Sequence, residues 1–467
     1  MVESELAEIE LPEFGLPDDR PTLSVETYRD RMRRLRKRAG RRFDVFIVYA
    51  DREHFANLAY LTGYDPRFEE ALLVVDLTEG EKPVLLVGNE GEGYARTSPI
   101  SDALSIVRFQ SFSLLGQDRT ESDSLETILR DAGVHGSANV GVAGWKHFVE
   151  AEFKDPETVL EIPSYLARTL RELVGDGGSV RNGNKILMDS DSGMRATSSD
   201  VDQLAYFEFA AAHTSQAIRN VLFGVQPGMT EYEAVELMAV NGIPQSCHLM
   251  LSTGERAQHG LLSPSARMIE RGDPFTTAYG VWGALNSRAG FVVDGAEELA
   301  DDIADYVDRL VKPYFEAVVA WYERVGVDVR GGTLYDAIHD RIGDPFFGVE
   351  LNPGHLIHLD EWVDSPVYEG STERLESGMA VQVDVIPATG TEYFMTNIED
   401  GILLADGDLR AEFAAAHPDA WERIQRRRRF MTDRLGIDIG EDVLPLSNIP
   451  AYLPPFLLSS DRALKAV

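Results

Sequence analysis

The sequence lacks several features that direct proteins to an export route or a membrane. A single cysteine, Cys247, excludes an internal disulfide and agrees with a reducing compartment. No apolar run approaches about 18 residues, the length that a membrane-spanning helix needs. The N-terminus is acidic and interrupted by proline, whereas a secretory signal has a basic start and an apolar core. We therefore expect a cytoplasmic protein that makes no membrane contact.

Positive charge is also scarce. The chain has 44 lysine and arginine residues against 78 aspartate and glutamate residues, which gives a formal net charge of −34. An acidic surface repels phosphate, so nonspecific binding of nucleic acid is not expected. The basic run from Arg426 to Arg429 is interpreted as a solvated helix face rather than a binding patch.

What the sequence does contain is the alternation of strands and helices typical of an α/β protein. Apolar, β-branched runs such as DVFIVYA and ALLVV alternate with helical patterns through about residue 175, and a stretch rich in Gly, Ser, Asp and Asn follows. The apolar C-terminal tail is expected to pack across the body or against a second subunit. We predict four segments, namely a loosely ordered lead-in at 1–22, an N-terminal α/β domain at 23–185, a second domain at 195–410, and a C-terminal helix and tail at 411–467.

Polar side chains gather between residues 352 and 401. His355 and His358 come first, and Asp384 and Glu399 then occupy inward positions of two short predicted strands. A carboxylate inside a β-branched strand is costly to bury unless it has a partner or a function. A histidine and two carboxylates on adjacent strands are typical of a metal site or of acid/base catalysis, and both alternatives stand at this point.

Successive sequence landmarks resemble those of the creatinase/aminopeptidase P family. They span roughly residues 45 to 405 and read NLAYLTGY, PGMTE, LSTGERAQHG followed by ERGD, NPGH, LESGMAVQVDVIP and NIEDGILL. The resemblance implies an α/β (α+β) protein in which a creatinase-like N-terminal α/β domain precedes a C-terminal pita-bread domain that curls a sheet around the site. It also implies a homodimer in which the N-terminal domain of one subunit covers the site of the other.

Metallopeptidase members of that family hold two divalent metals, and the resemblance places only part of their ligand set on this chain. It assigns the histidine to His355, the first late carboxylate to Asp384, where the family has glutamate, and the second to Glu399. The two upstream aspartates fall on residues without a carboxylate, namely Ala278 and Asn286 or Ser287. A bridged two-metal site is therefore not expected, and the chain would bind no metal or one divalent ion, such as Mn, Fe, Co or Zn, at His355, Asp384 and Glu399.

The creatinase branch, which cleaves C–N bonds in small amidino compounds without metal, offers a second template. Its proton-shuttling histidine matches His259 in RAQHG. The carboxylate that supports this histidine falls at Ser287, just before Arg288, so this template is incomplete as well. Of this template, the chain retains His259, Arg288 and Asp384.

We expect a hydrolase that cleaves a C–N bond in an Xaa-Pro-like peptide or in a small amide or amidino metabolite. His259 and His355 would move protons, while Asp384, Glu399 and Arg288 complete the catalytic set around a water molecule or one metal. The substrate pocket is expected to include His358, Tyr279 and Trp282. The alternative is a non-catalytic pita-bread relative that binds a ligand or partner. The enzyme is favoured because a pure scaffold has no use for a cluster of buried polar groups, which is costly.

Overall fold

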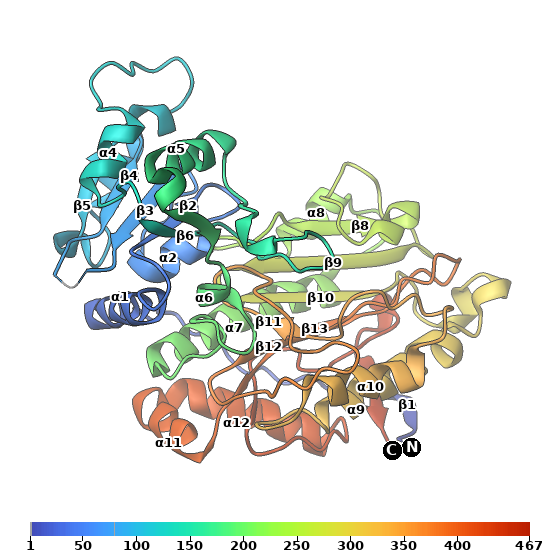
Figure 1. Ribbon diagram of the computed structural model, residues 1–467. Helices are drawn as coiled ribbons and strands as arrows, with labels where there is room; N and C mark the ends of the chain where they lie inside the picture. Colours follow the sequence, from blue (N-terminus) through green and yellow to red (C-terminus); the bar gives the residue numbers. More distant parts are fainter. Residues whose placement is uncertain (1, 79) are drawn as a thin grey trace. The chain divides into compact units, whose positions relative to one another are not determined.

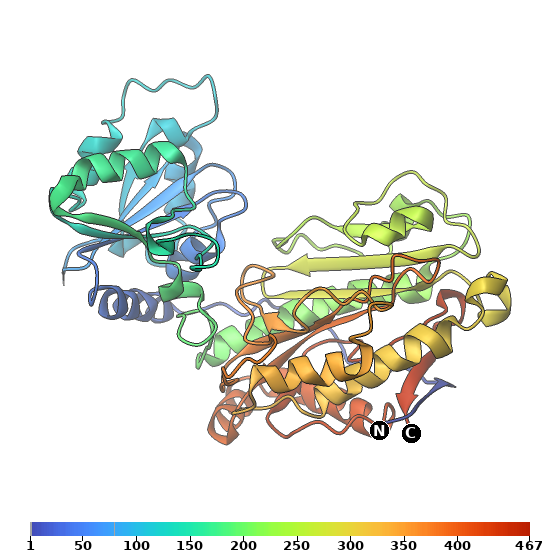
Figure 2. The same ribbon diagram turned by 45° about the vertical axis from the view of Figure 1, so that its right-hand side comes forward.

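The structure, a computed structural model, describes residues 2–78 and 80–467. It divides into two compact units, a smaller unit formed by Leu23–Arg195 and a larger unit formed by Met1–Thr22 with Ala196–Val467 (Figure 1 and Figure 2). The boundary between them falls at the end of the Gly-, Ser- and Asp-rich stretch of the sequence. Among the described residues, no helix is both long enough and apolar enough to cross a lipid bilayer.

The smaller unit is built on a mixed sheet whose strands are β2 (Val45–Ala50), β3 (Ala71–Asp76), β4 (Val84–Val87), β5 (Ser105–Arg108), β6 (Asn139–Ala143) and β7 (Ser179–Asn182). The six strands follow the order β5-β4-β3-β2-β6-β7. β3 runs antiparallel to β2 and β4, whereas β6 runs parallel to β2 and β7. β2 is buried at every position, which explains why its sequence is continuously apolar instead of alternating.

Helices cover this sheet and connect its strands; they are α1 (Val25–Ala39), α2 (Ala56–Thr62), α3 (Asn89–Ala95), α4 (Leu125–Asp131), α5 (Ser164–Val174) and α6 (Lys185–Met188). The N-cap of α1 is Ser24, whose side chain accepts a hydrogen bond from Thr27 N, as the Ser/Thr-rich start of this segment predicts. Apolar side chains of α4 and α5, including Leu129 and Leu170, pack against the sheet in one core.

The larger unit contains a second sheet, whose strands are β8 (Met250–Thr253), β9 (Pro274–Val281), β10 (Ala284–Phe291), β11 (His355–Leu356), β12 (Ala380–Val385), β13 (Ile398–Leu404) and β14 (Val443–Pro445). The order is β11-β12-β13-β10-β9-β8, and β14 adds to β13. Every pair is antiparallel, so each pairing register shows directly which side chains share a face.

Its helices are α7 (Val201–Gly224), α8 (Glu231–Glu236), α9 (Lys312–Tyr322), α10 (Gly331–Ile342), α11 (Gly407–Ala416) and α12 (Pro418–Asp433). α7 packs against β9, β10 and β13 and is buried over most of its length. Thr230 and Glu233 form a capping box at the start of α8, and Thr230 belongs to the PGMTE landmark.

Both ends of the chain are fixed to the larger unit. β1 (Ser4–Glu8) pairs antiparallel with β15 (Arg462–Ala466), and the two termini lie side by side in Figure 1. The prediction of a loosely ordered lead-in was therefore wrong, because the partner strand lies more than 450 residues away and leaves no local signal. The apolar tail packs on its own chain, with Tyr452 and Phe456 almost fully buried.

The basic run on α12 also differs from the expectation of a solvated face. Arg427 is fully buried, and its guanidinium lies 2.7 Å from a carboxylate oxygen of Glu208 on α7. Arg423 binds the other oxygen of Glu208 at 2.6 Å. Arg427 of this run, together with Arg423 one turn earlier, therefore anchors α12 to α7 through a buried acidic residue, which periodicity alone could not reveal.

Candidate active site

A single row of residues crosses the sheet of the larger unit. Through successive antiparallel pairs it connects Asp384 on β12, Glu399 on β13, Ser287 on β10, Ala278 on β9 and Met250 on β8. Cross-strand partners project to the same face of a sheet, so these side chains share one face. The row has an acidic half on β12 and β13 and a neutral half on β10 and β9.

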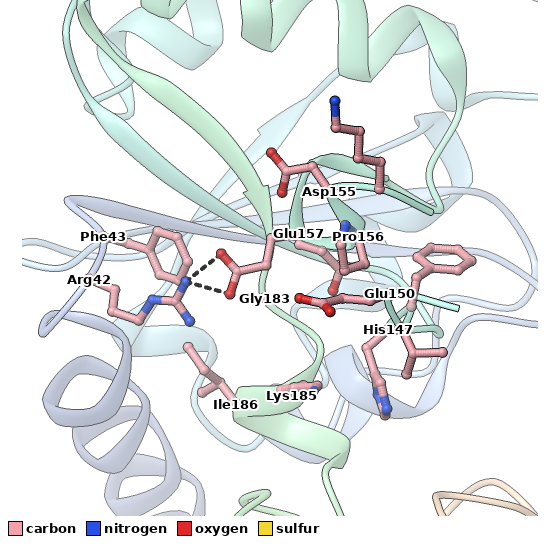
Figure 3. A pocket seen from close by; sticks show the side chains of 14 residues that line it. Arg42, Phe43, His147, Glu150, Asp155, Pro156, Glu157, Gly183, Lys185 and Ile186 are labelled. Carbon is pink, nitrogen blue, oxygen red and sulfur yellow. Dashed lines mark hydrogen bonds and ion pairs between the residues drawn. The ribbon is translucent and has the colours of Figure 1, made fainter. Parts of the chain in front are cut away.

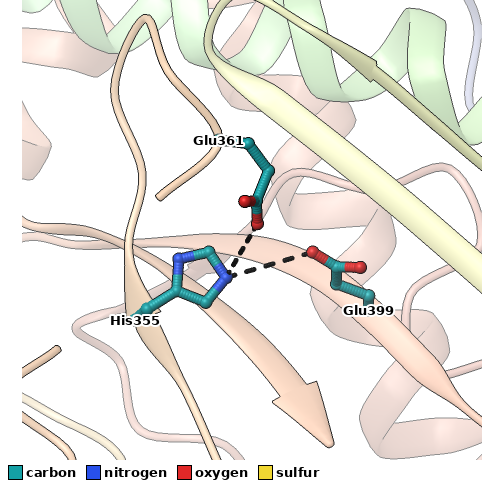
Figure 4. Close-up of side chains that lie close together, drawn as sticks. All are labelled: His355, Glu361 and Glu399. Atoms are coloured by element: carbon teal, nitrogen blue, oxygen red, sulfur yellow. Dashed lines mark ion pairs between the residues drawn. The ribbon is translucent and has the colours of Figure 1, made fainter. Parts of the chain in front are cut away.

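His355 and Glu361 complete the acidic half. His355 on β11 pairs with Gln382, which lies two residues before Asp384 on β12 and hence on the same face. Its Nε2 lies 3.2 Å from Glu361 Oε1, 3.8 Å from Asp384 Oδ2 and 4.0 Å from Glu399 Oε1. Figure 4 shows His355, Glu361 and Glu399 directed toward one another, and one potential ligand atom from each lies within 4.8 Å of the others. We name these four residues, His355, Glu361, Asp384 and Glu399, the His355 cluster.

The donor chemistry of the His355 cluster fits a divalent cation. His355 Nδ1 lies 3.3 Å from the Leu356 carbonyl, and the tautomer that donates this bond turns the Nε2 lone pair toward the carboxylates. Among the described residues, neither His355 Nε2 nor Asp384 Oδ1 has a hydrogen-bond partner. In the same part of the chain, no lysine or arginine pairs with Glu361, Asp384 or Glu399. One imidazole nitrogen and several carboxylate oxygens are ligands for Zn, Mn, Fe or Co.

Burial and mutual repulsion dominate the electrostatics of the cluster. His355 is 0% exposed, and Asp384 and Glu399 are each 4% exposed. Burial, followed by the charges of Asp384 and Glu361, holds the pKa of Glu399 well above its ordinary range. Burial also raises the pKa of Asp384 to about 6, against the opposing effect of His355. Burial lowers the pKa of His355, but Glu361 and Asp384 outweigh it, and the net direction is upward.

Neighbouring side chains fix the orientation of the cluster. The indole of Trp362 stacks on the His355 ring, with 4.1 Å between the ring centroids and 14° between the planes. Gln382 Nε2 donates to Glu399 Oε1 at 3.3 Å and to the Leu285 carbonyl at 2.6 Å. These contacts hold the imidazole and one carboxylate before any ligand binds, as partners outside a metal's own ligands do.

The neutral half of the row forms an apolar floor beside the cluster. Ala278 packs with the other members of a small apolar group, which are Met250, Leu285 and the partly buried Cys247. Burial raises the pKa of the Cys247 thiol to about 12, and the next causes are Glu361 and Glu399, so this floor lies within the field of the cluster. Ser287 Oγ donates to the Thr277 carbonyl at 3.1 Å and accepts from Asn397 Nδ2 at 2.9 Å.

The opposite face of the same strands carries a satisfied polar network. Asn286, the other residue considered for the second upstream position, donates to Asp400 Oδ1 at 2.8 Å and accepts from Thr214 on α7. Arg288 lies 2.7 Å from Asp400 Oδ2, and its other donors bind carbonyl oxygens of Ser287, Ile449 and Tyr452. The side chain of Arg288, which the second template placed in the catalytic set, therefore lies on the face opposite the side chains of Ser287 and Glu399, as strand alternation requires.

Two further predicted histidines lie outside the cluster. His259 is exposed at the end of the short helical segment Gly254–His259, and its Nε2 lies 3.3 Å from Gln258 Nε2. Among the described residues, no ion pair connects His259 with Asp384 or Glu399. His358 is buried, and its ring packs edge-on against Phe207 of α7 with 5.2 Å between the centroids.

The two aromatic residues expected in the substrate pocket are buried. Tyr279 pairs with Asn286 across β9 and β10 and thus shares the face that packs on α7. Trp282 lies in the turn between these strands and is 6% exposed. The side chain of Tyr279 therefore lies on the face opposite the His355 cluster and the apolar floor.

Glu361 is the site residue that sequence reasoning missed. It lies in a loop that folds back on β11, where Leu356 N donates to the Asp364 carbonyl at 2.8 Å and Val363 N donates to the Leu356 carbonyl at 2.9 Å. The only available signal was an acidic residue six positions after His355 in GHLIHLDEW. Spacing alone could not show that the loop returns this carboxylate to the imidazole.

No family model matches the sequence, and no curated protein matches it as a relative. Solved structures do match its fold. The Xaa-Pro dipeptidase from Bacillus anthracis is 18% identical with a TM-score of 0.57, and the match covers 82% of this chain and 96% of that one. The prolidase from Thermococcus sibiricus is 16% identical with a TM-score of 0.61, over 81% and 95% of the two chains. Dipeptidase PepE from Mycobacterium ulcerans is 16% identical with a TM-score of 0.58, and the match covers 84% of this chain and 95% of that one.

The fold indicated by the sequence landmarks is thereby confirmed. The chain has the pita-bread fold of these peptidases, together with their mixed α/β architecture.

Proposed function

We propose that the protein is a hydrolase that cleaves a C–N bond in a small peptide or amide at a single divalent metal ion. The observation that carries this proposal is the buried His355 cluster, in which an imidazole and three carboxylates converge without a lysine or arginine partner among the described residues. Such a group is costly to bury unless a cation or protons neutralise it. The printed names of the structural neighbours, which are Xaa-Pro dipeptidases and prolidases, support a peptide substrate.

In this proposal His355, Glu361 and Glu399 hold the ion, because one potential ligand atom from each lies within 4.8 Å of the others. Asp384 lies beside them, with Oδ2 at 3.8 Å from His355 Nε2 and with Oδ1 free of hydrogen bonds among the described residues. It is placed to accept a proton from an attacking water and to return it to the leaving nitrogen. A bound divalent ion would polarise the scissile carbonyl and make that water more acidic.

The neutral half of the row supports two parts of the proposal, a single metal ion and a substrate with an uncharged group beside the reacting bond. Ala278 and Ser287 provide no carboxylate for a second ion. The apolar floor of Cys247, Met250, Ala278 and Leu285 instead offers a surface for an uncharged side chain next to the reacting bond. A proline ring or another compact apolar group fits this chemistry. A second candidate function, ligand binding without turnover, is favoured by the same loss of the upstream carboxylates.

The decisive experiment measures metal content and activity on the same preparation. Protein purified without chelator is analysed for bound metal, then assayed on a panel of Xaa-Pro dipeptides and small amides before and after chelation and re-addition of Mn, Co or Zn. We expect about one equivalent per chain and activity that chelation removes and metal restores. Two equivalents would overturn the single-metal site. Full activity without metal would favour a metal-free reaction, and bound metal without turnover would favour ligand binding.

Matched variants show whether the His355 cluster is the site. Glu361→Gln removes a proposed ligand that no family motif supplied, and Glu350→Gln changes an exposed glutamate nearby in the chain. We expect the first variant to weaken metal binding at least tenfold, as loss of a ligand does, and the second to leave it unchanged. Equal metal content in both variants would remove Glu361 from the site.

A further inference from the structure

The smaller unit carries a concentration of positive charge that runs against the composition of the chain. A hollow of about 770 Å³ is lined by six basic residues, Arg34, Lys37, Arg38, Arg41, Arg42 and Lys185, together with Ile186, Asp189, Asp191 and Ser192. We name it the basic hollow. The whole chain has only 44 basic residues against 78 acidic ones. A cluster of this kind therefore needs an explanation other than the average surface.

Most of these cations come from one face of α1. Arg34, Lys37 and Arg38 are spaced three and four residues apart, and Arg41 continues the same spacing just beyond the helix end. Like charges at these spacings destabilise a helix by about 0.2–0.5 kcal/mol per pair. Burial, followed by repulsion from Arg34 and Arg41, lowers the pKa of Arg38. These repulsions oppose the favourable interaction of Lys37 and Arg38 with the C-terminal end of the helix, since both lie in its last turn.

Two other arginines of the same helix have carboxylate partners, whereas the stripe has none among the described residues. Arg29 lies 2.9 Å from Asp102, and Arg33 lies 2.8 Å from Glu26. Asp189, which lines the basic hollow, is engaged by the backbone and hydroxyl of Ser192 at 2.9 Å. Within the described part of the chain, five cations of the hollow form no ion pair with a carboxylate, namely Arg34, Lys37, Arg38, Arg41 and Lys185.

A second cavity continues the basic hollow. It measures about 490 Å³ and shares Arg42, Lys185 and Ile186 with the hollow (Figure 3). Arg42 is neutralised there by Glu157, whose two carboxylate oxygens each lie 2.9 Å from its Nη2. Part of the remaining wall is apolar and includes Phe43, Phe148, Val149 and Pro156. The continuous concavity therefore has a cationic end and a partly apolar end.

We propose that the basic hollow binds a small multivalent anion of the phosphate type and that the adjoining cavity receives the uncharged part of the same ligand. Arginine and lysine donors suit phosphate oxygens. Charges are screened beyond about 8 Å at physiological salt, so the local cations decide the binding of a small ligand. A long nucleic acid would extend over a chain with a net charge of −34, and repulsion from that surface argues against it.

The test uses pyrenetetrasulfonate as a fluorescent tetra-anion, because sulfonates bind divalent metals weakly and would leave the His355 cluster undisturbed. Its anisotropy is titrated with the full-length protein at low salt. The double variant Lys37→Gln/Arg41→Gln removes two unpaired cations. The control Arg29→Gln/Arg33→Gln removes two paired arginines from the same helix, with the same change in net charge. We expect the first variant to bind about tenfold more weakly and the control to change affinity less than about twofold.

Displacement by ATP or by inorganic tripolyphosphate, both in metal-free buffer, distinguishes a nucleotide from a simple polyphosphate. Stronger displacement by ATP supports use of the adjoining cavity, and equal displacement would overturn that part of the proposal. Absence of saturable binding would overturn the whole of it. An equal loss of affinity in both double variants would also overturn the proposal, because the effect would then reflect net charge. Normal binding by Lys37→Gln/Arg41→Gln would overturn it too, because the anion would then lie elsewhere.

Discussion

The acidic and neutral halves of one row of the sheet have the same backbone and different chemistry. On β12 and β13 the row carries Asp384 and Glu399, and on β10 and β9 it continues as Ser287 and Ala278. The pairing register is unbroken across the halves, so the scaffold holds four equivalent positions and fills only two of them with carboxylates. The comparison teaches that the number of carboxylates available to a metal ion is set by side chains and not by the fold, whose geometry both halves share.

The two faces of β13 sharpen this contrast. Glu399 and Asp400 are consecutive, and both are buried. Asp400 faces the guanidinium of Arg288 at 2.7 Å, whereas Glu399 faces His355 and other carboxylates. Two unit charges about 4 Å apart interact by roughly 4 kcal/mol at an effective dielectric constant of about 20, which favours the pair and opposes the cluster. One face is therefore complete by itself, and the other becomes favourable only with protons or a cation.

The largest expected effect comes from removing the nitrogen ligand of the acidic half. His355→Ala should abolish bound metal, because the ion loses its only nitrogen ligand in the cluster. It should also reduce kcat/KM by about a thousandfold or more, because the metal no longer stabilises the transition state. Metal analysis and steady-state kinetics on the dipeptide panel measure both quantities. The exposed Glu350→Gln serves as the control for substitution. Normal metal content in His355→Ala would place the ion elsewhere.

The two faces should respond oppositely when each loses a negative charge. Asp400→Asn leaves the fully buried Arg288 without its anionic partner and should lower the free energy of unfolding by about 3–5 kcal/mol. Glu399→Gln, one residue earlier, removes a repelled charge and should leave the metal-free stability equal or higher while metal binding falls. Urea unfolding of both variants without metal makes the comparison. Equal destabilisation would mean that the two faces do not differ as described.

Restoring carboxylates to the neutral half should convert one kind of site into the other. Ala278→Asp/Ser287→Asp places acidic groups at the two upstream positions of the row, so metal content should rise from about one to about two equivalents per chain. Without metal, the added buried charges should destabilise the fold by roughly 1–3 kcal/mol. Metal titration followed by calorimetry measures the stoichiometry. Asn286→Asp is the control, since Asn286 points to the α7 face and should add no ion. A stoichiometry that stays at one would show that more than side chains distinguishes the halves.

Much of the fold was predictable because its signals are local. β2 and most of β3 are continuous apolar runs, and Thr230 is a residue type that commonly caps helices. The landmarks around His355, Asp384 and Glu399 placed three members of the cluster, and the family resemblance placed the two upstream positions at Ala278 and at Asn286 or Ser287. These features depend on residues close in sequence or on motifs with fixed offsets.

What sequence reasoning missed depends on contacts between distant segments. Glu361 reaches His355 through a loop that folds back, Arg288 is directed to Asp400 by strand alternation, and Arg427 is buried by Glu208 of another helix. A template supplied catalytic roles for Arg288 without showing which face it occupies. Register between strands, which decides the face, is a tertiary property that one sequence does not reveal by spacing.

The smallest expected effect is a pH dependence confined to the acidic half. In the folded metal-free protein burial raises the pKa of Asp384 to about 6, while an unfolded aspartate titrates near about 3.9. The folded state therefore holds this proton more tightly, so the contribution of Asp384 to stability is fully present below about pH 4 and is lost as the pH rises through about 6.

Asp384→Asn mimics the protonated form at every pH. Wild type should thus lose stability relative to this variant between about pH 5 and pH 7.5 without metal, and gain stability relative to it at the higher pH when metal is bound. Thermal unfolding of wild type, Asp384→Asn and the exposed control Asp408→Asn measures these differences. A difference between wild type and Asp384→Asn that does not change with pH would show that Asp384 is not one of the repelling carboxylates, and the acidic half would then reduce to the three residues that approach one another within 4.8 Å.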